Sequence, residues 1–368
     1  MIILQTQCDA LLKPLQTVAG MVERRHTLPI LSNVLIEQTN NALHITATDL
    51  DIQISTRSPA FASEDFSLTT SAKKLLDILR AMPEQATLSL DQQAERLVLT
   101  SGKSRFNLQT LPAKDFPKLE MEPETLATFT LSQQHLHQLL SLVQYSVASQ
   151  DIRYYLNGLL LQTRAKQCHF VATDGHRLAY VQTALDDTMP DLELILPKKT
   201  VTELYKLLSF DADQTITVKL SAKQAVFEFN AIQIISKMID GKFPNYNDAI
   251  PLDNDKIFLA NRLDLLHALQ RAAILANEKE RNVKLSLKPN ALSIVCTNSE
   301  NEEAEEELEI AYQGEAMTIH FNVNYLLDLL NNLSDDTLQL ALSDNRHPAL
   351  FVVPGNPNFK YVVMPLRV

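Results

Sequence analysis

The sequence of 368 residues has no tryptophan, only 7 glycines and 3 cysteines, and no long hydrophobic run. The scarcity of glycine, without a Ser/Gly tract, excludes a flexible low-complexity region. The apolar stretch from Met1 to Leu4 is far shorter than the core of a signal peptide. Nothing approaches the roughly 20 apolar residues of a membrane span. We therefore expect a cytoplasmic protein that has no membrane association.

The few cysteines do not form a recognisable pattern. Cys8, Cys168 and Cys296 are far apart and odd in number. No Cys-x-x-Cys or Cys/His spacing typical of a zinc site accompanies them. We expect buried or half-buried free thiols in a reducing compartment, and neither a metal nor a cofactor.

An excess of positive charge is missing as well. The formal net charge is −11, from 33 Lys and Arg against 44 Asp and Glu. This balance argues against a conventional DNA-binding domain, which is usually basic. Apolar residues make up 45% of a chain long enough for two or three domains, so each domain can bury a core. Composition alone favours an acidic cytosolic enzyme.

What the sequence does contain is one unit that occurs three times. Its first helix has an apolar face with a period near 3.6 residues. That face recurs at offsets of 125 and 254 residues, as Leu11, Leu15, Val18 and Val22, then Leu136, Leu140, Val143 and Val147, then Leu265, Leu269, Ala272 and Ala276.

Both helices of each copy carry start signals. Ser132 and Asn261 stand at equivalent positions and predict N-caps, with Gln7 a weaker one. Pro14 should kink or delay the first helix. A second helix is predicted to begin near three matching positions, Ser71, Pro197 and Asn322.

Strand-like segments repeat between these helices. The run from Ala42 to Thr46 alternates apolar and polar residues, as half-buried antiparallel strands do. Such a run ends in Thr48-Asp49, in Thr173-Asp174 and in Thr297-Asn298. The dipeptide Phe116-Pro117 also reappears as Phe243-Pro244.

The repeats predict three domains, 1–125, 126–253 and 254–368. Each copy has two helices and several strands, which indicates an α+β fold, and the period is too long for a solenoid. Three rigid modules with almost no linker suggest an arc, and an arc that pairs with a second arc closes a ring. Repetition alone leaves a three-domain enzyme grown by duplication equally open.

Eight short stretches, in order along the whole chain, decide between these alternatives. On them the chain resembles the beta subunit family of bacterial DNA polymerase III, the sliding clamps. The matching stretches are Leu11–Leu15, Thr27–Leu31, Ser104–Phe106, Arg153–Gly158, Val171–Leu178, Asp240–Pro244, Arg271–Leu275 and Tyr361–Arg367.

This resemblance implies three tandem DNA-clamp domains of two helices and two sheets, with six domains in a dimeric ring. It implies a non-enzymatic clamp that encircles double-stranded DNA without sequence preference and holds the DNA polymerase III catalytic subunit on its template. It also implies docking of the clamp loader, other DNA polymerases and repair proteins through short peptide motifs. No cofactor is implied, and the chain has no GxxxxGK[ST] phosphate loop.

The resemblance assigns three groups of site residues. A partner-peptide groove is implied at Leu156, Thr173, Gly175, His176, Arg177, Leu178, Pro244, Val362, Val363, Met364, Pro365 and Arg367. Contacts with DNA are implied at Arg25, Gln150, Tyr154 and Tyr155. The homodimer interface is implied at Phe106 and Leu108 of one subunit against Ile274 and Leu275 of the other.

The segment from Thr173 to Arg177 has an alternative interpretation. Asp174 and His176 stand two residues apart, as in an acid–base or metal pair, so a hydrolase or metal-dependent enzyme centred here is the rival function. A strand end followed by a glycine turn, with Asp174 bonding the turn backbone, explains the same residues. A peptide-binding scaffold that does not bind DNA is a third possibility.

Charge is distributed unequally between the first and third copies. Seven glutamates lie between Glu300 and Glu309, whereas Lys73, Lys74, Arg80, Arg96, Lys103 and Arg105 fall in the first copy. A solvated face explains the glutamates, but a basic end and an acidic end also favour head-to-tail pairing. Asp248 and Ala249 stand where the family often has Arg and Val, and the segment Asn345–Leu350 has no assigned role.

Overall fold

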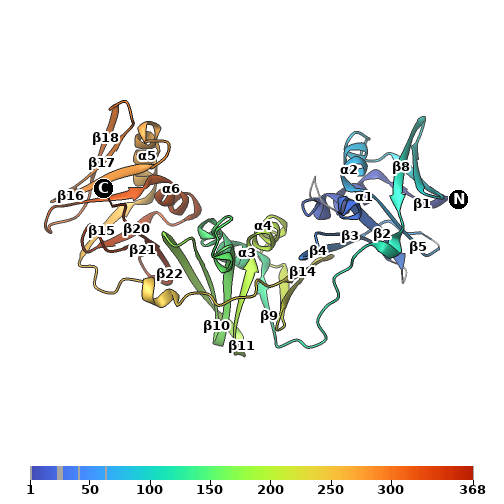
Figure 1. The fold of residues 1–368 in the computed structure, drawn as a ribbon, viewed down its shortest axis with the longest axis horizontal. Coiled ribbons are helices and arrows are strands. Elements are labelled where there is room, and N and C mark those ends of the chain that lie inside the picture. Colours follow the sequence, from blue (N-terminus) through green and yellow to red (C-terminus); the bar gives the residue numbers. More distant parts are fainter. Residues whose placement is uncertain (1, 23–27, 40–41, 63, 368) are drawn as a thin grey trace. The chain divides into compact units, whose positions relative to one another are not determined.

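The computed structural model describes residues 2–22, 28–39, 42–62 and 64–367 (Figure 1). The chain divides into two compact units, each described by itself. The first unit comprises Met1–Leu136 and Thr202–Met238, and the second comprises His137–Val201 and Ile239–Val368. Residues predicted to form the second domain therefore contribute to both units.

The first unit is built on one antiparallel sheet of 12 strands, in the order β1-β6-β7-β8-β5-β2-β3-β4-β14-β13-β12-β9. The first unit also contains two helices, α1 (Cys8–Ala19) and α2 (Ala72–Arg80), which lie side by side. The strands are β1 (Ile2–Gln7), β2 (Asn33–Thr39), β3 (Ala42–Thr48), β4 (Ile52–Ser58), β5 (Phe66–Ser71), β6 (Thr87–Gln93), β7 (Arg96–Ser101), β8 (Ser104–Leu111), β9 (Ala127–Ser132), β12 (Thr215–Leu220), β13 (Gln224–Phe229) and β14 (Ile232–Lys237).

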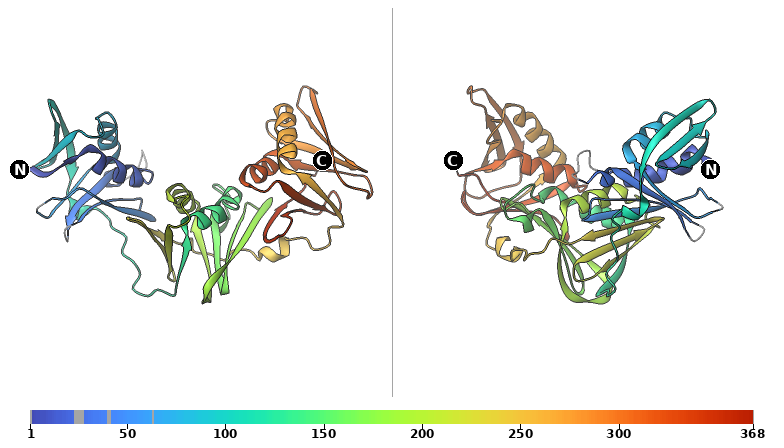
Figure 2. Two further views of the ribbon diagram at one scale, coloured as in Figure 1. Left: turned by 180° about the vertical axis from the view of Figure 1, so that it is seen from behind. Right: turned by 45° about the vertical axis from the view of Figure 1, so that its right-hand side comes forward.

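The second unit has a 6-stranded sheet, β10-β11-β22-β21-β20-β15, and a 4-stranded sheet, β18-β17-β16-β19. Its helices α5 (Arg262–Ala272) and α6 (Val323–Asn332) lie side by side (Figure 2). The strands are β10 (Gly158–Thr173), β11 (Arg177–Pro197), β15 (Lys256–Asn261), β16 (Asn282–Lys288), β17 (Ala291–Thr297), β18 (Glu303–Glu309), β19 (Met317–Asn322), β20 (Thr337–Leu342), β21 (Ala349–Val353) and β22 (Asn356–Val363). Helices α3 (Gln133–Ser141) and α4 (Lys198–Leu207) each have residues in both units.

The predicted helix starts are confirmed by their caps. The Ser132 hydroxyl accepts the amide N–H of His135 at 3.1 Å. The Asn261 side chain accepts the N–H of Asp264 at 3.1 Å, and the Asn322 side chain caps α6 in the same way. Each cap satisfies one of the donors that a helix N-terminus leaves unpaired. Gln7, the weaker prediction, makes no side-chain cap bond.

Pro14 was expected to kink or delay the first helix, and of these two outcomes the delay is wrong. Helix α1 begins at Cys8 and continues through Pro14, which is buried. A proline has no N–H, so the carbonyl four residues earlier loses its helical partner. That carbonyl belongs to Ala10, and it accepts the Ser58 hydroxyl at 2.5 Å instead. A side chain from β4 thus replaces the missing helical bond.

Two strand pairs join successive copies of the repeat. Strand β14 of the second copy pairs with β4 of the first, with Ile234 opposite Ile54. Strand β22 of the third copy pairs with β11 of the second, with Val362 opposite Leu178. All four of these side chains are buried. The joints therefore combine backbone ladders with apolar packing, and the second one carries the residues of the groove described below.

Candidate functional site

The segment from Thr173 to Arg177 is a closed turn between β10 and β11. The Asp174 carboxylate accepts the backbone N–H groups of His176 and Arg177 at 2.9 and 3.0 Å. The Thr173 hydroxyl donates to the Arg177 carbonyl at 2.6 Å. Gly175 between them has a φ of +88°, a conformation that glycine adopts without strain. Asp174 and Thr173 are thus engaged in the turn itself.

The first copy of the repeat contains the same turn. Asp49 accepts the N–H groups of Asp51 and Ile52 at 3.0 and 2.9 Å, and the Thr48 hydroxyl donates to the Ile52 carbonyl at 2.8 Å. Leu50 there has a φ of +81° where the second copy has Gly175. Because the turn recurs without a histidine, its aspartate and threonine serve the fold, and the pattern does not define an acid–base pair.

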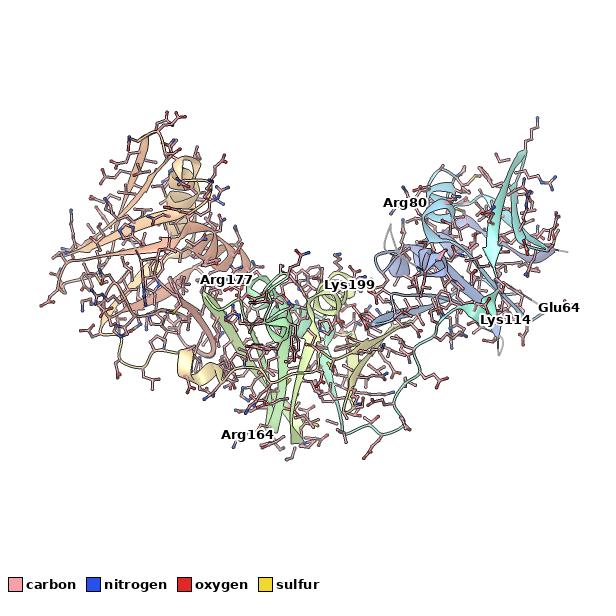
Figure 3. All side chains as sticks on the ribbon, in the orientation of Figure 1. Glu64, Arg80, Lys114, Arg164, Arg177 and Lys199 are labelled. Atoms are coloured by element: carbon pink, nitrogen blue, oxygen red, sulfur yellow. The ribbon has the colours of Figure 1, made fainter. Side chains whose placement is uncertain are left out.

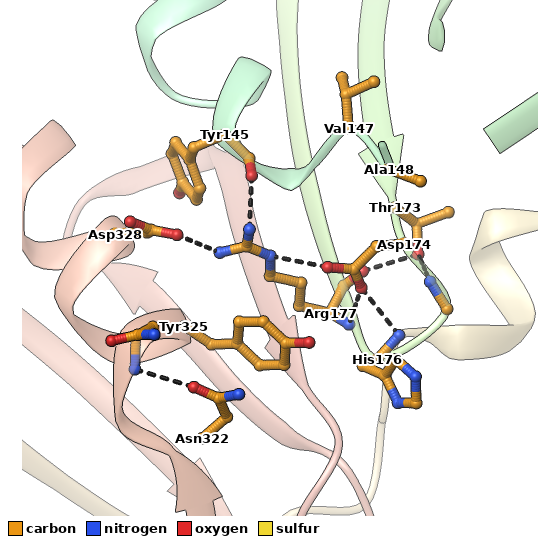
Figure 4. A network of polar contacts seen from close by, with 12 residues as sticks. Tyr145, Val147, Ala148, Thr173, Asp174, His176, Arg177, Asn322, Tyr325 and Asp328 are labelled. Carbon is orange, nitrogen blue, oxygen red and sulfur yellow. Dashed lines mark hydrogen bonds and ion pairs between the residues drawn. The ribbon is translucent and has the colours of Figure 1, made fainter. Parts of the chain in front are cut away.

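Arg177 leaves this turn and enters a buried polar network (Figure 4). Its guanidinium donates to the Asp174 carboxylate at 3.0 Å, to the Asp328 carboxylate at 2.6 Å and to the Tyr145 carbonyl at 2.5 Å. The plane also lies over the ring of Tyr325, 4.5 Å from its centroid. The Arg177 side chain is only 10% exposed. Bonds from one planar set of donors to three separate acceptors, together with stacking on a ring, suit arginine rather than lysine.

The network keeps Arg177 charged although burial opposes its charge. Desolvation lowers the pKa of the guanidinium, but the nearby Tyr361 and the bond to Asp328 outweigh it and raise the pKa above its usual value. Asp328 and Tyr325 belong to α6 of the third copy, and Arg177 begins β11 of the second. The arginine therefore fixes the turn against α6.

A groove of about 450 Å³ opens beside the turn. Its floor is apolar, since the buried Leu156, Leu178 and Val362 belong to the core cluster that includes Phe243 and Ile250. Its other lining residues are Arg153, Tyr155, Thr173, Gly175, His176, Arg177, Pro244, Asn245, Tyr246, Asp248, Ala249, Pro348 and Met364. An apolar floor with a polar rim is the usual character of a ligand-binding groove.

The segment that follows β22 forms one wall of the groove. The N–H of Met364 donates to the His176 carbonyl at 2.8 Å, which ties the C-terminal segment to the turn. The Met364 side chain is 41% exposed and lines the groove. The wall is therefore a continuation of the ladder between β11 and β22.

Nine of the twelve residues predicted for the groove line it: Leu156, Thr173, Gly175, His176, Arg177, Leu178, Pro244, Val362 and Met364. The other three, Val363, Pro365 and Arg367, do not. Val363 is fully buried in β22, and Arg367 lines a separate polar cleft. The alternation of side chains along β22 explains why Val362 and Val363 face opposite ways.

Arg153 lines the groove but was not predicted to do so. It makes a two-pronged ion pair with Asp151, with bonds of 3.0 and 2.8 Å, and donates to the Asp174 carbonyl at 3.2 Å. The side-chain bond from Arg153 lowers the pKa of Asp151 to about 2. A Cβ at Gly175 would lie 2.9 Å from the Arg153 guanidinium. The Arg-Tyr-Tyr motif was a signal for this residue, but only its tyrosines were assigned roles.

The other missed residues follow the Phe243-Pro244 motif or precede β21. Tyr246, Asp248 and Ala249 lie on the short 3-10 helix Tyr246–Ala249. The Asp248 carboxylate accepts the Asn245 amide at 2.8 Å. Asp248 and Ala249, where the sequence departs from the family's usual Arg and Val, line the groove. Pro348 had no sequence signal that linked it to the groove.

The predicted DNA contacts lie on the segment before β10, except Arg25, which lies outside the described residues. Gln150 is exposed with a φ of +56°, and Tyr154 is exposed while Tyr155 is half-buried. Ile152 between them is 96% exposed. Lys198, another basic residue of this region, donates to the Val147 carbonyl at 3.0 Å and to the Ser149 hydroxyl, so its ammonium holds this segment.

The predicted dimer residues lie next to two open strand edges, one in each unit. Strand β8 pairs with β7 through Ser104 to Gln109, and among the described residues it meets β5 only at Thr110 and Leu111. Phe106 is half-buried and Leu108 is buried on that strand. Strand β18 ends the 4-stranded sheet, and within the described ranges it pairs with β17 alone. Open edges of this length present unpaired backbone groups.

Strand β18 carries the glutamate run. Its alternation exposes Glu303, Glu305, Glu307 and Glu309 and turns Glu306 inward. Glu306 makes a two-pronged ion pair with Arg271 of α5, with bonds of 2.7 and 2.5 Å. Ile274, just beyond α5, is 79% exposed, and Leu275 is half-buried. The acidic strand thus lies beside one exposed and one half-buried apolar side chain.

In the part of the chain that the structure describes, no group of three or more His, Cys, Asp or Glu side chains is placed to hold a metal ion. Among the same residues, no helix has the length and apolar character needed to cross a membrane.

Models of the DNA polymerase III beta subunit match almost the whole chain. The N-terminal domain model matches residues 2–120, the central domain model 130–245 and the C-terminal domain model 247–367. The beta sliding clamp of Pseudomonas putida is 41% identical over 98% of this chain and 99% of its own length. The clamp of Escherichia coli K12 is 39% identical over 98% of each chain.

Solved structures agree with these matches. A crystal structure of the DNA polymerase III subunit beta of Pseudomonas aeruginosa is 39% identical, has a TM-score of 0.94 and covers 99% of this chain and 100% of its own. A sliding clamp from the same organism, bound to griselimycin, is 38% identical with a TM-score of 0.94, over 100% of both chains. Repeated α+β domains with a groove and open edges define a clamp-type binding protein.

The chain belongs to the DNA polymerase III beta subunit family, the bacterial sliding clamps. The predicted α+β fold of three clamp domains and the prediction of a non-enzymatic sliding clamp are confirmed. The alternative of a hydrolase or metal-dependent enzyme has no support. Membership of this family implies interaction with DNA and a polymerase, and formation of a dimer.

The network around Arg177 predicts a stability change. Asp328→Asn keeps the shape of the side chain but removes the charge that pairs with Arg177 at 2.6 Å. Since Asp328 is 43% exposed, solvent screening limits the expected loss to about 1 kcal/mol of unfolding free energy. Urea unfolding of the full chain measures it, and Asp253→Asn, at an exposed carboxylate, is the matched control. Equal stability of the two variants would show that the pair contributes nothing.

Proposed function

We propose that this sliding clamp pairs head to tail with a second copy, encircles duplex DNA and holds the catalytic subunit of DNA polymerase III on its template. We further propose that the clamp loader, other DNA polymerases and repair proteins dock in the groove beside Arg177. The domain boundaries of this proposal are 1–125, 126–253 and 254–368. Free thiols at Cys8, Cys168 and Cys296 suit a reducing cytoplasm, where we place this function.

The groove carries the docking proposal. Its volume of about 450 Å³ is suited to one or two large apolar side chains rather than to a folded surface. The floor of Leu156, Leu178 and Val362 can receive leucine or phenylalanine anchors, which lose water on binding. Because the floor continues into the core, the receiving surface is rigid before any ligand arrives.

The rim determines what else the ligand needs. Met364 is unbranched and partly exposed, so its thioether can adapt to different anchor shapes. His176 is exposed at the tip of the turn and can bond a backbone or polar side chain of an extended peptide. Asp248 puts a negative charge on the same rim and disfavours an acidic ligand residue beside it.

The two open edges support the dimer proposal. Strand β8 offers unpaired backbone groups between Ser104 and Gln109, and β18 offers another unpaired edge. Natural proteins rarely leave such edges uncovered, because they pair with other chains. A second copy that places β8 against β18 satisfies both. Two copies then close with two identical contacts, which is a ring.

Charge gives this pairing its direction. The exposed face of β18 carries Glu303, Glu305, Glu307 and Glu309, while Lys103 and Arg105 are exposed at the start of β8. Like charges on one strand repel, and a basic strand opposite relieves that repulsion. Ile274 and Leu275 lie beside β18, where they would meet Phe106 and Leu108 of the other copy.

Contacts with DNA are proposed at Arg25, Gln150, Tyr154 and Tyr155. The exposed Gln150 and Tyr154 can bond sugar and phosphate groups, which fixes position on a duplex without reading its sequence. A net charge of −11 makes overall attraction to DNA weak. A closed ring does not need strong contacts, since it is retained by topology, and weak contacts allow it to slide.

The docking proposal predicts a selective loss of peptide binding. Met364→Ala removes part of one wall of the groove. We expect about tenfold weaker binding of a labelled peptide with the core Gln-Leu-x-Leu-Phe (QLxLF), which supplies leucine and phenylalanine anchors, as truncation of a binding-surface anchor typically gives. Fluorescence anisotropy measures it. Ile257→Ala, at a half-exposed apolar side chain of β15, is the control and should bind normally. An unchanged affinity of the Met364 variant would contradict the assignment.

The dimer proposal predicts a change of mass. Replacing Ile274 and Leu275 together by Ala removes apolar area that the contact buries, at about 1.5–3 kcal/mol for each side chain. The double variant should be largely monomeric at micromolar concentration by light scattering. Leu252→Ala with Ile257→Ala removes as much exposed apolar surface elsewhere in the same unit and should leave the dimer intact. If the variant at Ile274 and Leu275 still has the mass of a dimer, the proposed interface is wrong.

The DNA proposal predicts weaker retention without a change of assembly. Gln150→Ala with Tyr154→Ala should lower affinity for primed duplex about three- to tenfold at low salt, with the dimer unchanged. Retention on circular against linearised duplex measures encirclement, because a ring slides off open ends. Gln167→Ala with Phe61→Ala, at two exposed side chains, is the control. Equal loading of both double variants would mean that Gln150 and Tyr154 do not touch DNA.

A further inference from the structure

A second concave site lies next to the groove, and it is polar where the groove is apolar. This cleft has a volume of about 660 Å³ and is lined by Thr318, His320, Asn345, Arg346, Leu366 and Arg367. Two arginines and a histidine thus face one hollow on a chain whose net charge is −11. None of these six described residues carries a negative charge.

The loop before β21, which had no role in the sequence, forms one side of the cleft. The Asp344 carboxylate accepts the backbone N–H groups of Arg346 and His347 at 2.8 and 2.9 Å. The bond from Arg346 and then that from His347 hold the pKa of Asp344 at about 2, so this carboxylate stays an acceptor at neutral pH. The Asp344 carboxylate is thus bonded within the loop, and the exposed Arg346 side chain lines the cleft.

The C-terminal segment forms the other side. The N–H of Leu366 donates to the His320 carbonyl at 2.7 Å, which holds the segment against β19. The His320 ring bonds the Asn282 side chain at 3.1 Å through Nδ1. Burial, followed by the charge of Lys284, lowers the pKa of His320, so its ring is neutral at pH 7. The charge that the cleft offers a ligand therefore comes from its two arginines.

Neither arginine has a carboxylate partner within the part of the chain that the structure describes. Arg153, Arg177 and Arg271, by contrast, each pair with an aspartate or glutamate. Both Arg346 and Arg367 are exposed. A guanidinium offers a flat fork of donors that matches a carboxylate, and two such forks in one hollow form an anion site.

The cleft continues the groove. In the pairing of β21 with β22, Ala349 lies opposite Val363, so the same register places Pro348 near Met364 and Arg346 near Leu366. Pro348 and Met364 line the groove, whereas Arg346 and Leu366 line the cleft. The step from one to the other is two residues along each segment. An extended peptide spans that distance with about two or three residues, at roughly 3.3 Å each.

We propose that the cleft is a specificity subsite for acidic side chains of a partner peptide whose apolar anchor occupies the groove. This inference rests on the proposed docking function. Arg346 and Arg367 pair with one or two carboxylates located about two or three residues from the anchor. Asp248 on the groove rim repels the same acidic residues, so only a peptide with its acid on the cleft side fits both sites.

The observations favour an acidic peptide over nucleic acid. The cleft adjoins a groove whose apolar floor suits leucine or phenylalanine, and a phosphate backbone has no side chain of that kind to place there. The cleft has two cationic side chains, Arg346 and Arg367, which lie in one hollow. A strand of nucleic acid instead follows an extended basic groove.

The experiment uses the full-length dimer and labelled peptides with one QLxLF-type core. Three serines, three aspartates or three lysines extend the core at either end, and anisotropy gives each affinity. At the end of the core that lies toward the cleft, the aspartate-extended peptide should bind about three- to tenfold more tightly than the serine-extended peptide. The lysine-extended peptide should bind more weakly than the serine-extended one. The preference should shrink with added salt, because the pairs are exposed.

The matched variants separate the cleft from general charge. Arg346→Ser with Arg367→Ser should abolish the preference for aspartate while the serine-extended peptide binds as before. Arg164→Ser, at an arginine far along the β10–β11 hairpin (Figure 3), removes the same kind of charge and should keep the preference. A preference that survives the double variant, or is absent at both ends of the peptide, would overturn the proposal.

The failure of this inference is distinguishable from failure of the docking function. If the serine-extended peptide does not bind at all, the groove assignment itself is wrong and the cleft assignment falls with it. If that peptide binds but aspartates bring no gain, only the cleft assignment fails. If the double variant instead weakens binding to single-stranded or duplex DNA and leaves every peptide unaffected, the cleft is a nucleic-acid contact and the proposal is overturned.

Discussion

A strand at the edge of a sheet must find partners for its backbone N–H and carbonyl groups, and this constraint organises the whole chain. Within each unit the constraint is met across the boundary between repeats, where β4 pairs with β14 and β11 pairs with β22. The groove exists because of the second joint, since the turn that opens β11 and the segment that leaves β22 line it together. Among the described residues, the edge of β18 and the part of β8 before its two-residue contact with β5 stay open, in the third and first copies of the repeat.

The repeats diverge where the joints require it. The turn after β3 and the turn after β10 share one hydrogen-bond scheme, yet the first holds Leu50 and the second Gly175 at positive φ. At the second turn the Arg153 guanidinium lies 2.9 Å from where a Cβ of residue 175 would be, which explains why that position is a glycine. Only the second turn also ends in Arg177, which reaches the α6 residue Asp328. The same hydrogen-bond scheme therefore forms a wall of the groove only in the second copy, because the residues around that turn differ.

Sequence predicted the parts that depend on neighbours in the chain. Caps such as Ser132 and Asn261 bond groups three residues away, so their side-chain type and position suffice. The contact of Arg177 with Asp328 spans 151 residues and was not visible. Most groove residues came from resemblance rather than from pattern. Pro348 and the arginine cleft were missed because their proximity depends on the register of β21 with β22, which no local signal determines.

The proline in α1 has a consequence for how the sequence can vary. The Ala10 carbonyl loses its helical partner at Pro14 and is satisfied by the Ser58 hydroxyl. The two residues are therefore interdependent: loss of the hydroxyl at 58 leaves the Ala10 carbonyl without this partner unless residue 14 supplies its own N–H. Lineages that carry the proline are expected to retain a hydroxyl at 58, and lineages that lose the proline are free to drift there. Epistasis of this kind makes the order of substitutions in the duplicated domains matter.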